Sequence, residues 1–188
     1  MCHLFTQHSP IVRLAKLEAI HIFSLFISAI IHDIGHPGFT NAFMVNTSSE
    51  IAFQYNDISV LENYHIAEAF RIMRLPECNI FEHLEPSEFR TIRRLMIEMV
   101  LATDMSKHGE TVANIGTKFE DVAENKPFVL ALILHASDIS HAIRPFDVTY
   151  QWTVAIQTEF FAQGDRERVL GQEVTFVCDR ENLNIPKS

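Results

Sequence analysis

The sequence predicts an all-α protein that forms a single domain. Apolar residues recur at helical spacing along most of the 188 residues, while alternating, strand-like runs are scarce. The composition is that of an ordinary globular protein, with 47% hydrophobic residues and only six Gly and seven Pro. A chain of this length can bury one substantial core, and most of its 15 Phe side chains are expected there.

Several helices can be placed along the chain. Leu14–Asp33 is expected to form one long buried helix that ends before Pro37. Ser59 with Glu62 matches a capping box and predicts a helix that continues to about residue 71. The other expected helices are 86–103, 128–140 and 147–163, whereas the polar segment 109–125 is expected to be a loop or a short helix. No repeat, linker or low-complexity tract divides the chain, so residues 1–188 are expected to be one domain.

Charge and cysteine content argue against several classes of protein. The formal charge of −9 disfavours a nucleic-acid partner, because a surface that tracks phosphates needs clustered Lys and Arg. The most apolar run, Ile20–Ile31, has 12 residues and contains His21, so it is too short to span a membrane. Cys2, Cys78 and Cys178 lie far apart without a CxxC pair. This usage is typical of a reducing compartment and predicts a cytoplasmic protein.

Two polar clusters interrupt apolar helices and carry residue types that bind metal ions. His32 and Asp33 are adjacent and His36 follows at i+4, while His135 and Asp138 are at i and i+3. An imidazole suits a zinc-like ion, and an adjacent carboxylate can bridge to a harder ion such as magnesium or manganese. Asp138 is expected to be buried in its apolar helix, where an unpaired carboxylate is costly. Each residue alone fits a hydrogen-bonded His or a capping Asp, but together they predict a metal-dependent phosphohydrolase.

Further polar residues also interrupt or end apolar helices. Glu62 and His65 are at i and i+3, a spacing suited to hydrogen bonds with ordered water near a metal. The sequence leaves open the alternative of a capping Glu and an exposed His. Thr103 and Asp104 close another apolar helix and are equally compatible with an ordinary polar helix end. The Gly-x-Ser-x-Gly, His-Glu-x-x-His and P-loop patterns are absent from the sequence.

Six segments match one family in register. They are 32–41 (HDIGHPGFTN), 56–65 (NDISVLENYH), 99–108 (MVLATDMSKH), 135–140 (HASDIS), 151–152 (QW) and 159–165 (EFFAQGD). In combination they resemble the class I 3′,5′-cyclic nucleotide phosphodiesterases, over about residues 17–188. The resemblance implies a multi-helix bundle of the HD-type metal phosphohydrolase/phosphodiesterase fold. It also implies hydrolysis of the cyclic phosphodiester of cAMP or cGMP to the 5′-monophosphate, in cyclic nucleotide signalling.

The resemblance implies a role for each matching residue. His32, Asp33 and Asp138 would hold a zinc ion, and Asp33 would bridge to a second ion, magnesium or manganese. The shell that orders water around the second ion would be His36, Glu62, His65 and Thr103. Asp33 and His36 are the expected catalytic residues, at a site where water between two ions attacks phosphorus and the 3′ oxygen leaves.

A purine-binding wall is also implied. The expected substrate-binding residues are Asn41, Met105, His141, Trp152, Ile156 and Phe160. Trp152, Ile156 and Phe160 would form an apolar slot for the base, although their i, i+4, i+8 spacing also fits an ordinary helix core face. His141 stands where many members of the family carry Asn, which leaves base preference undecided. Weak similarity at 78–81 and 185–188 favours cAMP over cGMP as the bound nucleotide.

The ends of the chain lead to a further expectation. The family's upstream His-Asn-x-x-His motif would fall before Met1, and its purine-anchoring Gln would directly follow Ser188. The chain is therefore expected to be the middle of a catalytic domain, truncated at both ends, with little or no activity when made alone.

Two other functions stay open from the sequence. One is a catalytically inactive truncated module that binds metal or a partner, including a second copy in a homodimer, through exposed apolar surface. The other is a different His-Asp phosphohydrolase that acts on a nucleotide monophosphate or triphosphate. The segments 101–106 and 163–165 argue against the latter, because a bare metal motif does not require them.

Overall fold

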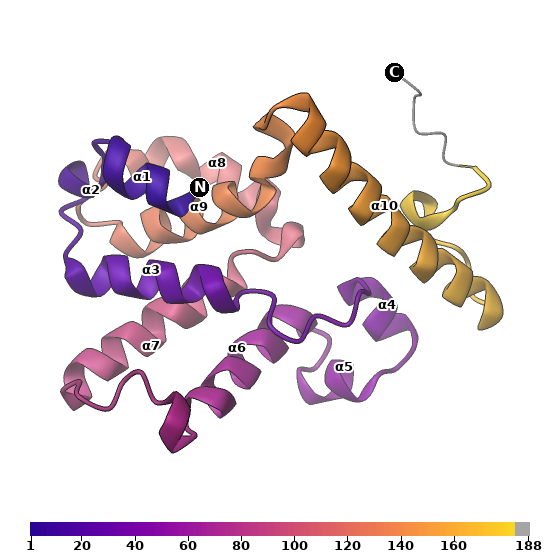
Figure 1. Ribbon diagram of the computed structural model, residues 1–188, viewed down its shortest axis with the longest axis horizontal. Coiled ribbons are helices and arrows are strands. Elements are labelled where there is room, and N and C mark those ends of the chain that lie inside the picture. Colours follow the sequence, from indigo (N-terminus) through magenta and orange to yellow (C-terminus); the bar gives the residue numbers. More distant parts are fainter. Residues whose placement is uncertain (183–188) are drawn as a thin grey trace.

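Helices form all of the regular secondary structure in residues 1–182, the part of the chain that the computed structural model describes (Figure 1). This part contains no strand, so the predicted all-α fold is confirmed. The α-helices are α1 (Cys2–His8), α2 (Ile11–Leu14), α3 (Ala19–Ile31), α4 (Asn41–Asn46), α5 (Glu50–Gln54), α6 (Val60–Met73), α7 (Pro86–Leu101), α8 (His108–Phe119), α9 (Lys126–Asp138) and α10 (Phe146–Val169). Short 3₁₀ helices are η1 (Pro76–Cys78), η2 (Met105–Lys107), η3 (Ile139–Ile143) and η4 (Phe176–Cys178). The 185–188 ending lies outside the described residues.

The core lies between α3, α6, α7 and α9. α3 packs along α7 and also contacts α9, and α7 contacts both α6 and α9. Leu25, Met99 and Leu130 belong to one cluster of buried apolar side chains, while Ile66 and Met96 belong to a second. α7 supplies both clusters, so it joins the two halves of the core. Burying each such side chain stabilises the fold by about 1.5–3 kcal/mol.

The expected helix Leu14–Asp33 is in fact two helices with a break between them. α2 ends at Leu14, and Lys16 has a φ of 49°, in the left-handed region that an α-helix cannot pass through. α3 then begins with a capping box, in which the Glu18 N–H donates to His21 Nδ1 at 3.0 Å. α3 also ends two residues earlier than expected, which places the His-Asp pair just past its last turn.

The helix predicted after Ser59 is present as α6, but its predicted capping box is wrong. Ser59 has a φ of 41° and makes no side-chain cap; its hydroxyl instead donates to Asp104 Oδ2 at 2.7 Å. Asp104 is only 6% exposed, and a buried carboxylate requires hydrogen-bond donors. The Ser59 hydroxyl therefore serves a long-range partner and does not cap its own helix.

The later helices agree with expectation apart from their ends. α7 begins at Pro86 as predicted, after a capping box between Glu85 and Glu88. The 109–125 segment is helical as far as Phe119, so the short-helix alternative is correct there. α10 continues past residue 163 to Val169.

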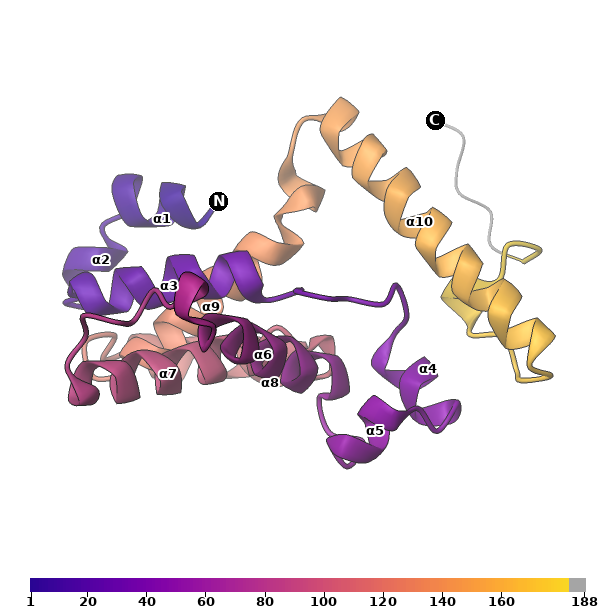
Figure 2. The ribbon, with the colours of Figure 1, turned by 60° about the horizontal axis from the view of Figure 1, so that its bottom comes forward.

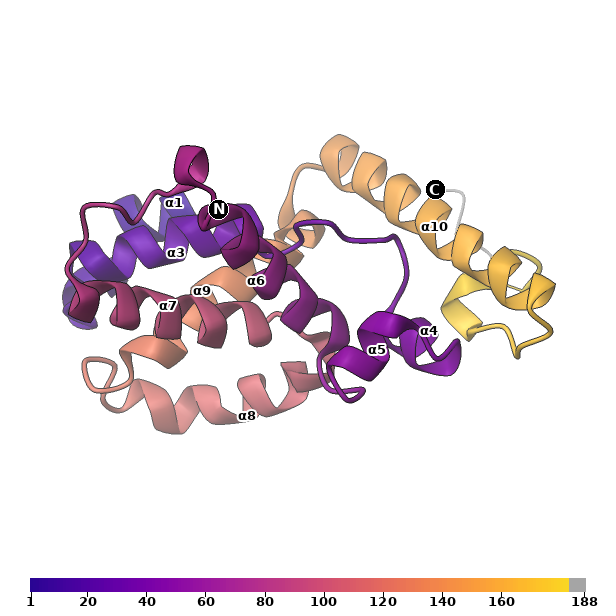
Figure 3. The same ribbon diagram turned by 90° about the horizontal axis from the view of Figure 1, so that it is seen from below.

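α10 stands apart from the bundle formed by the other long helices (Figures 2 and 3). It follows α9 through η3, and its far end approaches α4, where Gln172 Nε2 donates to the Asn46 carbonyl at 3.0 Å. η4 packs closely against α10 at Gly164, where an added Cβ would overlap the Cys178 carbonyl. Within residues 1–182, no helix has the length and apolarity that crossing a membrane requires.

Candidate metal centre and substrate cleft

The end of α3 fixes the orientation of His32. His32 is the C-cap residue, and its Nδ1–H donates to the Ala29 carbonyl at 3.0 Å. This bond leaves Nε2 as the ring nitrogen available to the cleft. The chain then turns sharply at Gly35, whose φ is 71°, and an added Cβ there would lie 3.2 Å from the Tyr64 ring. A larger residue at position 35 would therefore be strained in both backbone and space.

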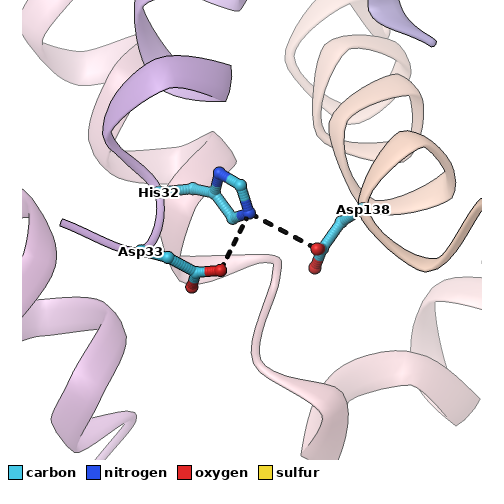
Figure 4. Close-up of side chains that lie close together, drawn as sticks. All are labelled: His32, Asp33 and Asp138. Atoms are coloured by element: carbon cyan, nitrogen blue, oxygen red, sulfur yellow. Dashed lines mark hydrogen bonds and ion pairs between the residues drawn. The ribbon is translucent and has the colours of Figure 1, made fainter. Parts of the chain in front are cut away.

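His32 Nε2 lies between two carboxylates (Figure 4). It is 3.2 Å from Asp33 Oδ2 and 3.3 Å from Asp138 Oδ1, although Asp138 is 106 positions away on α9. One ligand atom from each of these three residues lies within 4.8 Å of the others, a spacing that one ion can satisfy. Asp138 is the last residue of α9 and its side chain is 31% exposed, so the expectation that it is buried is wrong.

The charges in this cluster fit a bound cation. Hydrogen bonds to Asp138 and Asp33 raise the pKa of His32 to about 10. The bond from His32 in turn lowers the pKa of Asp33. At neutral pH an imidazolium thus holds its positive charge between two carboxylates. A divalent ion on Nε2 would replace that proton, and one nitrogen with two carboxylate oxygens is a donor set that suits zinc or manganese.

His65 and His36 lie beside Asp33. His65 is 1% exposed; its Nδ1–H donates to the Ile34 carbonyl at 2.8 Å, and its Nε2 is 3.9 Å from Asp33 Oδ1. Burial lowers the pKa of His65, which favours its neutral form. The His36 ring stacks on His65 with centroids 5.5 Å apart. The alternative of an exposed His at position 65 is therefore wrong.

Glu62 borders a neighbouring hollow of about 360 Å³ together with Asn41 and Thr103. The Asn41 Nδ2 donates to Glu62 Oε2 at 2.9 Å, while burial is the main cause that raises the pKa of Glu62. Thr103 is 8% exposed and its hydroxyl donates to the Val100 carbonyl at 2.8 Å. Asn41, Glu62 and Thr103, which were predicted near the second ion or the substrate, thus share one hollow.

A larger cleft of about 680 Å³ opens beside the His-Asp cluster. His32, Asp33 and Asp138 line one side, and Trp152 and Ile156 of α10 line the other, with His141 between them in the chain. The expected purine wall is divided, because Phe160 lines the neighbouring hollow instead, as does Met105, another residue expected to bind substrate. His36 lines both spaces, so the two adjoin at this residue.

Among the lining residues that sequence reasoning missed, three have long polar or charged side chains. Arg144 lines the cleft, Glu159 lines both spaces, and Gln163 lines the hollow. Glu159 and Gln163 fall within the 159–165 segment that matched the family, and this was the available signal. For Arg144 the sequence offered no signal beyond its position shortly after His141.

Comparison with known proteins supplies the family. The matching family model is that of the 3′5′-cyclic nucleotide phosphodiesterases, and it covers residues 1–188. The chain belongs to this family. The resemblance inferred from the six segments is confirmed, and the match begins at residue 1 and not at about residue 17.

Curated phosphodiesterases show the same relationship. The chain is 45% identical over 173 residues to a human dual specificity calcium/calmodulin-dependent 3′,5′-cyclic nucleotide phosphodiesterase 1B, covering 92% of this chain and 32% of that protein. It is 38% identical over 186 residues to a rat 3′,5′-cyclic-AMP phosphodiesterase 4C, covering 93% and 35%. The chain thus spans about a third of the length of the curated relatives it matches. The roles of individual site residues in this phosphodiesterase-family chain stay predictions.

Proposed function

We propose that the protein hydrolyses the 3′,5′-cyclic phosphodiester of cAMP, cGMP or both to the 5′-nucleoside monophosphate, with zinc and magnesium or manganese as cofactors. The observation that carries this proposal is the cluster of His32, Asp33 and Asp138 at the edge of a 680 Å³ cleft with an apolar opposite wall. A metal cluster beside an apolar slot suits a substrate that joins a phosphate to a purine. Family membership supports the same reaction.

Two metal positions are consistent with the geometry around Asp33. Its Oδ2 faces His32, and its Oδ1 faces the side occupied by His65. We assign His32, Asp33 and Asp138 to zinc, and the Asp33 side near His36, His65, Glu62 and Thr103 to magnesium or manganese. When bound, such ions neutralise phosphoryl charge and acidify water at neutral pH. Because the protein carries a net charge of −9, attraction of an anionic substrate has to come from this local positive charge.

Residues of the chain orient water and protons around this position. His36 Nδ1 accepts the Gly38 N–H at 3.0 Å, so its Nε2 carries the hydrogen when the ring is neutral. The raised pKa of Glu62 suits a carboxyl group that exchanges a proton with ordered water. We place both residues beside the attacking water, His36 where the cleft and the hollow adjoin and Glu62 at the border of the hollow.

The base is proposed to lie against Trp152 and Ile156. Trp152 is 55% exposed, so a large aromatic face is available for stacking with a purine. His141 lines the same cleft and is proposed to contact the base edge. We propose cAMP as the preferred nucleotide.

The three cysteines of the described part are free, which supports a reducing, cytoplasmic location.

A non-catalytic module is the second candidate. Phe146, Tyr150, Val154 and Val169 on α10 are all more than two-fifths exposed, at 69%, 54%, 44% and 75%. Such apolar surface favours association with a partner or a second copy in a homodimer. A module of this kind would bind metal without turning over substrate.

Metal content and product release distinguish these functions. Zinc and manganese are measured in the purified, chelator-washed intact protein, together with 5′-AMP release from cAMP and 5′-GMP release from cGMP. We expect bound metal and turnover in the wild type, and loss of both in Asp138→Asn. Asp147→Asn, which changes a carboxylate outside the cleft, is the matched control and should retain both. Metal without turnover would favour the inactive module, and absence of metal from the intact protein would contradict the proposal. Applied to residues 1–188 alone, the same assay tests the expected low activity.

A further inference from the structure

Gln163 is a buried amide on a helix that is otherwise largely exposed. Its exposure is 1%, and all of its side-chain donors and acceptors have partners. Oε1 accepts the Thr40 N–H at 2.8 Å, and Nε2 donates to Thr40 Oγ1 at 3.2 Å and to Glu167 Oε1 at 2.9 Å. The orientation of the amide follows from these partners, because only a carbonyl oxygen can face an N–H. Gln163 therefore holds a residue that lies 123 positions earlier in the chain.

Glu167 continues this network toward η4. The carboxylate is 3% exposed and accepts the Thr175 N–H at 2.7 Å and the Thr175 hydroxyl at 2.9 Å, in addition to Gln163 Nε2. Each of these neighbours donates, so the Glu167 carboxylate acts only as an acceptor in this network. The close approach of η4 at Gly164 keeps Thr175 within reach.

Thr40 connects the network to the hollow. It is the N-cap of α4, and the next residue, Asn41, makes two long-range bonds. Asn41 Oδ1 accepts the Leu61 N–H at 2.9 Å, and its Nδ2 donates to Glu62 Oε2 at 2.9 Å. An unbroken series of side-chain and backbone contacts thus runs from α10 through the start of α4 to the first turn of α6.

We infer that Gln163 is a positioning residue: by fixing Thr40 it holds Asn41, and through Asn41 it holds Glu62 at the border of the hollow. Trp152 and Ile156 belong to the same helix as Gln163. The wall of the cleft and the carboxylate of α6 are therefore kept in one fixed spatial relationship. The catalytic consequence rests on the proposed function, whereas the coupling between Gln163 and Glu62 does not.

A reciprocal exchange of two side chains tests this coupling. Gln163→Glu alone places two carboxylates against each other across the 2.9 Å contact with Glu167. Glu167→Gln alone forces an N–H to face either the amide of Gln163 or the N–H of Thr175. In the double variant, the carboxylate at 163 accepts from Thr40 and from the amide at 167, whose oxygen accepts the Thr175 N–H. Every donor again faces an acceptor. The hydrogen bond between positions 163 and 167 should therefore be lost in each single variant and restored only when both changes are present.

Hydrogen exchange at the Leu61 amide is the readout, because this N–H is bonded to Asn41 and not to Gln163. We expect roughly tenfold faster exchange at Leu61 in each single variant of the intact protein, and recovery to within about threefold of wild type in the double variant. Gln151→Glu is the matched control on the same helix, since Gln151 is exposed and lies outside both the network and the cleft. It should leave Leu61 exchange unchanged.

The outcomes that overturn the inference are specific. If Thr40 and Phe43 amides exchange faster in the single variants while Leu61 does not, Gln163 only packs locally. If a single variant fails to fold, the double variant decides. Wild-type protection at Leu61 then supports the coupling, and its loss overturns it.

Kinetics separate this inference from the proposed function. With cAMP as substrate, the single variants should lower kcat by roughly ten- to a hundredfold and raise the magnesium concentration needed for half-maximal rate, with a smaller change in KM. The double variant should recover kcat. A wild-type protein that hydrolyses neither cAMP nor cGMP would refute the proposed function, while Leu61 exchange would still test the coupling.

Discussion

His108 Nδ1 and His135 Nε2 lie 2.9 Å apart, and this hydrogen bond joins the start of α8 to the last turn of α9. His135 is 3% exposed, and its Nδ1 has no hydrogen-bond partner within the described part of the chain. A second proton on this ring would therefore be buried without an acceptor. Burial, followed by the nearby His108, lowers the pKa of His135.

Acid should destabilise the metal-free protein through His135. In the unfolded chain the ring takes up a proton near its ordinary pKa of 6.5, whereas the folded ring does so only at lower pH. The free energy of unfolding should therefore be insensitive to this group at higher pH and fall as pH drops below 6.5, by at most about 1.4 kcal/mol per pH unit. Urea unfolding in chelator at several pH values measures the slope. His135→Asn should flatten it, exposed His83→Asn should not, and equal slopes in all three proteins would contradict the prediction.

The pKa of His32 should depend more on Asp138 than on Asp33. The hydrogen bond to Asp138 is the largest cause that raises this pKa to about 10. In metal-free protein followed by NMR titration, Asp138→Asn should lower the pKa of His32 more than Asp33→Asn does. The control variant Asp147→Asn should leave the pKa of His32 unchanged. The opposite order would contradict the 3.3 Å contact between Asp138 Oδ1 and His32 Nε2, which Figure 4 marks with a dashed line.

Gly164→Ala should destabilise the contact between α10 and η4. The added Cβ would overlap the Cys178 carbonyl, a backbone atom that cannot rotate away. We expect a loss of about 1–3 kcal/mol in the free energy of unfolding. Gly116→Ala is the matched control, because a Cβ there meets nothing within 4 Å in the middle of α8. It should stabilise the protein by about 0.5–1 kcal/mol, and equal effects at both positions would rule out the overlap as the cause.

Trp152→Ala should weaken substrate binding with little change in stability. Trp152 is 55% exposed, so its removal leaves no large cavity. Loss of stacking on a base costs about 1–3 kcal/mol, which corresponds to a rise in KM of roughly 5- to 150-fold. Tyr150→Ala removes an aromatic side chain of similar exposure, 54%, that does not line the cleft. A similar KM in both variants would argue against the proposed base position.

The helical fold and the His-Asp cluster were both predictable from the sequence, for local reasons. The periodicity of α7 and α9 is a property of each segment alone, and His32 with Asp33 carries its chemistry in two adjacent residues. The points at which individual helices begin and the long-range partners of single residues were not predictable from the sequence. Ser59 has a positive φ and its hydroxyl donates to Asp104, 45 positions away, and neither feature is visible in the local sequence. The same limit applies to Gln163, an ordinary helix residue in sequence whose burial depends on Thr40.

The large separation between His32 and Asp138 sets an order of events during synthesis. The two residues are 106 positions apart, so at about 5–20 residues per second a ribosome adds the second roughly 5–20 s after the first. During that interval the nascent His32-Asp33 pair lacks Asp138, the third residue of the proposed metal site. The proposed three-residue metal site can therefore be complete only after the end of α9 has been synthesised.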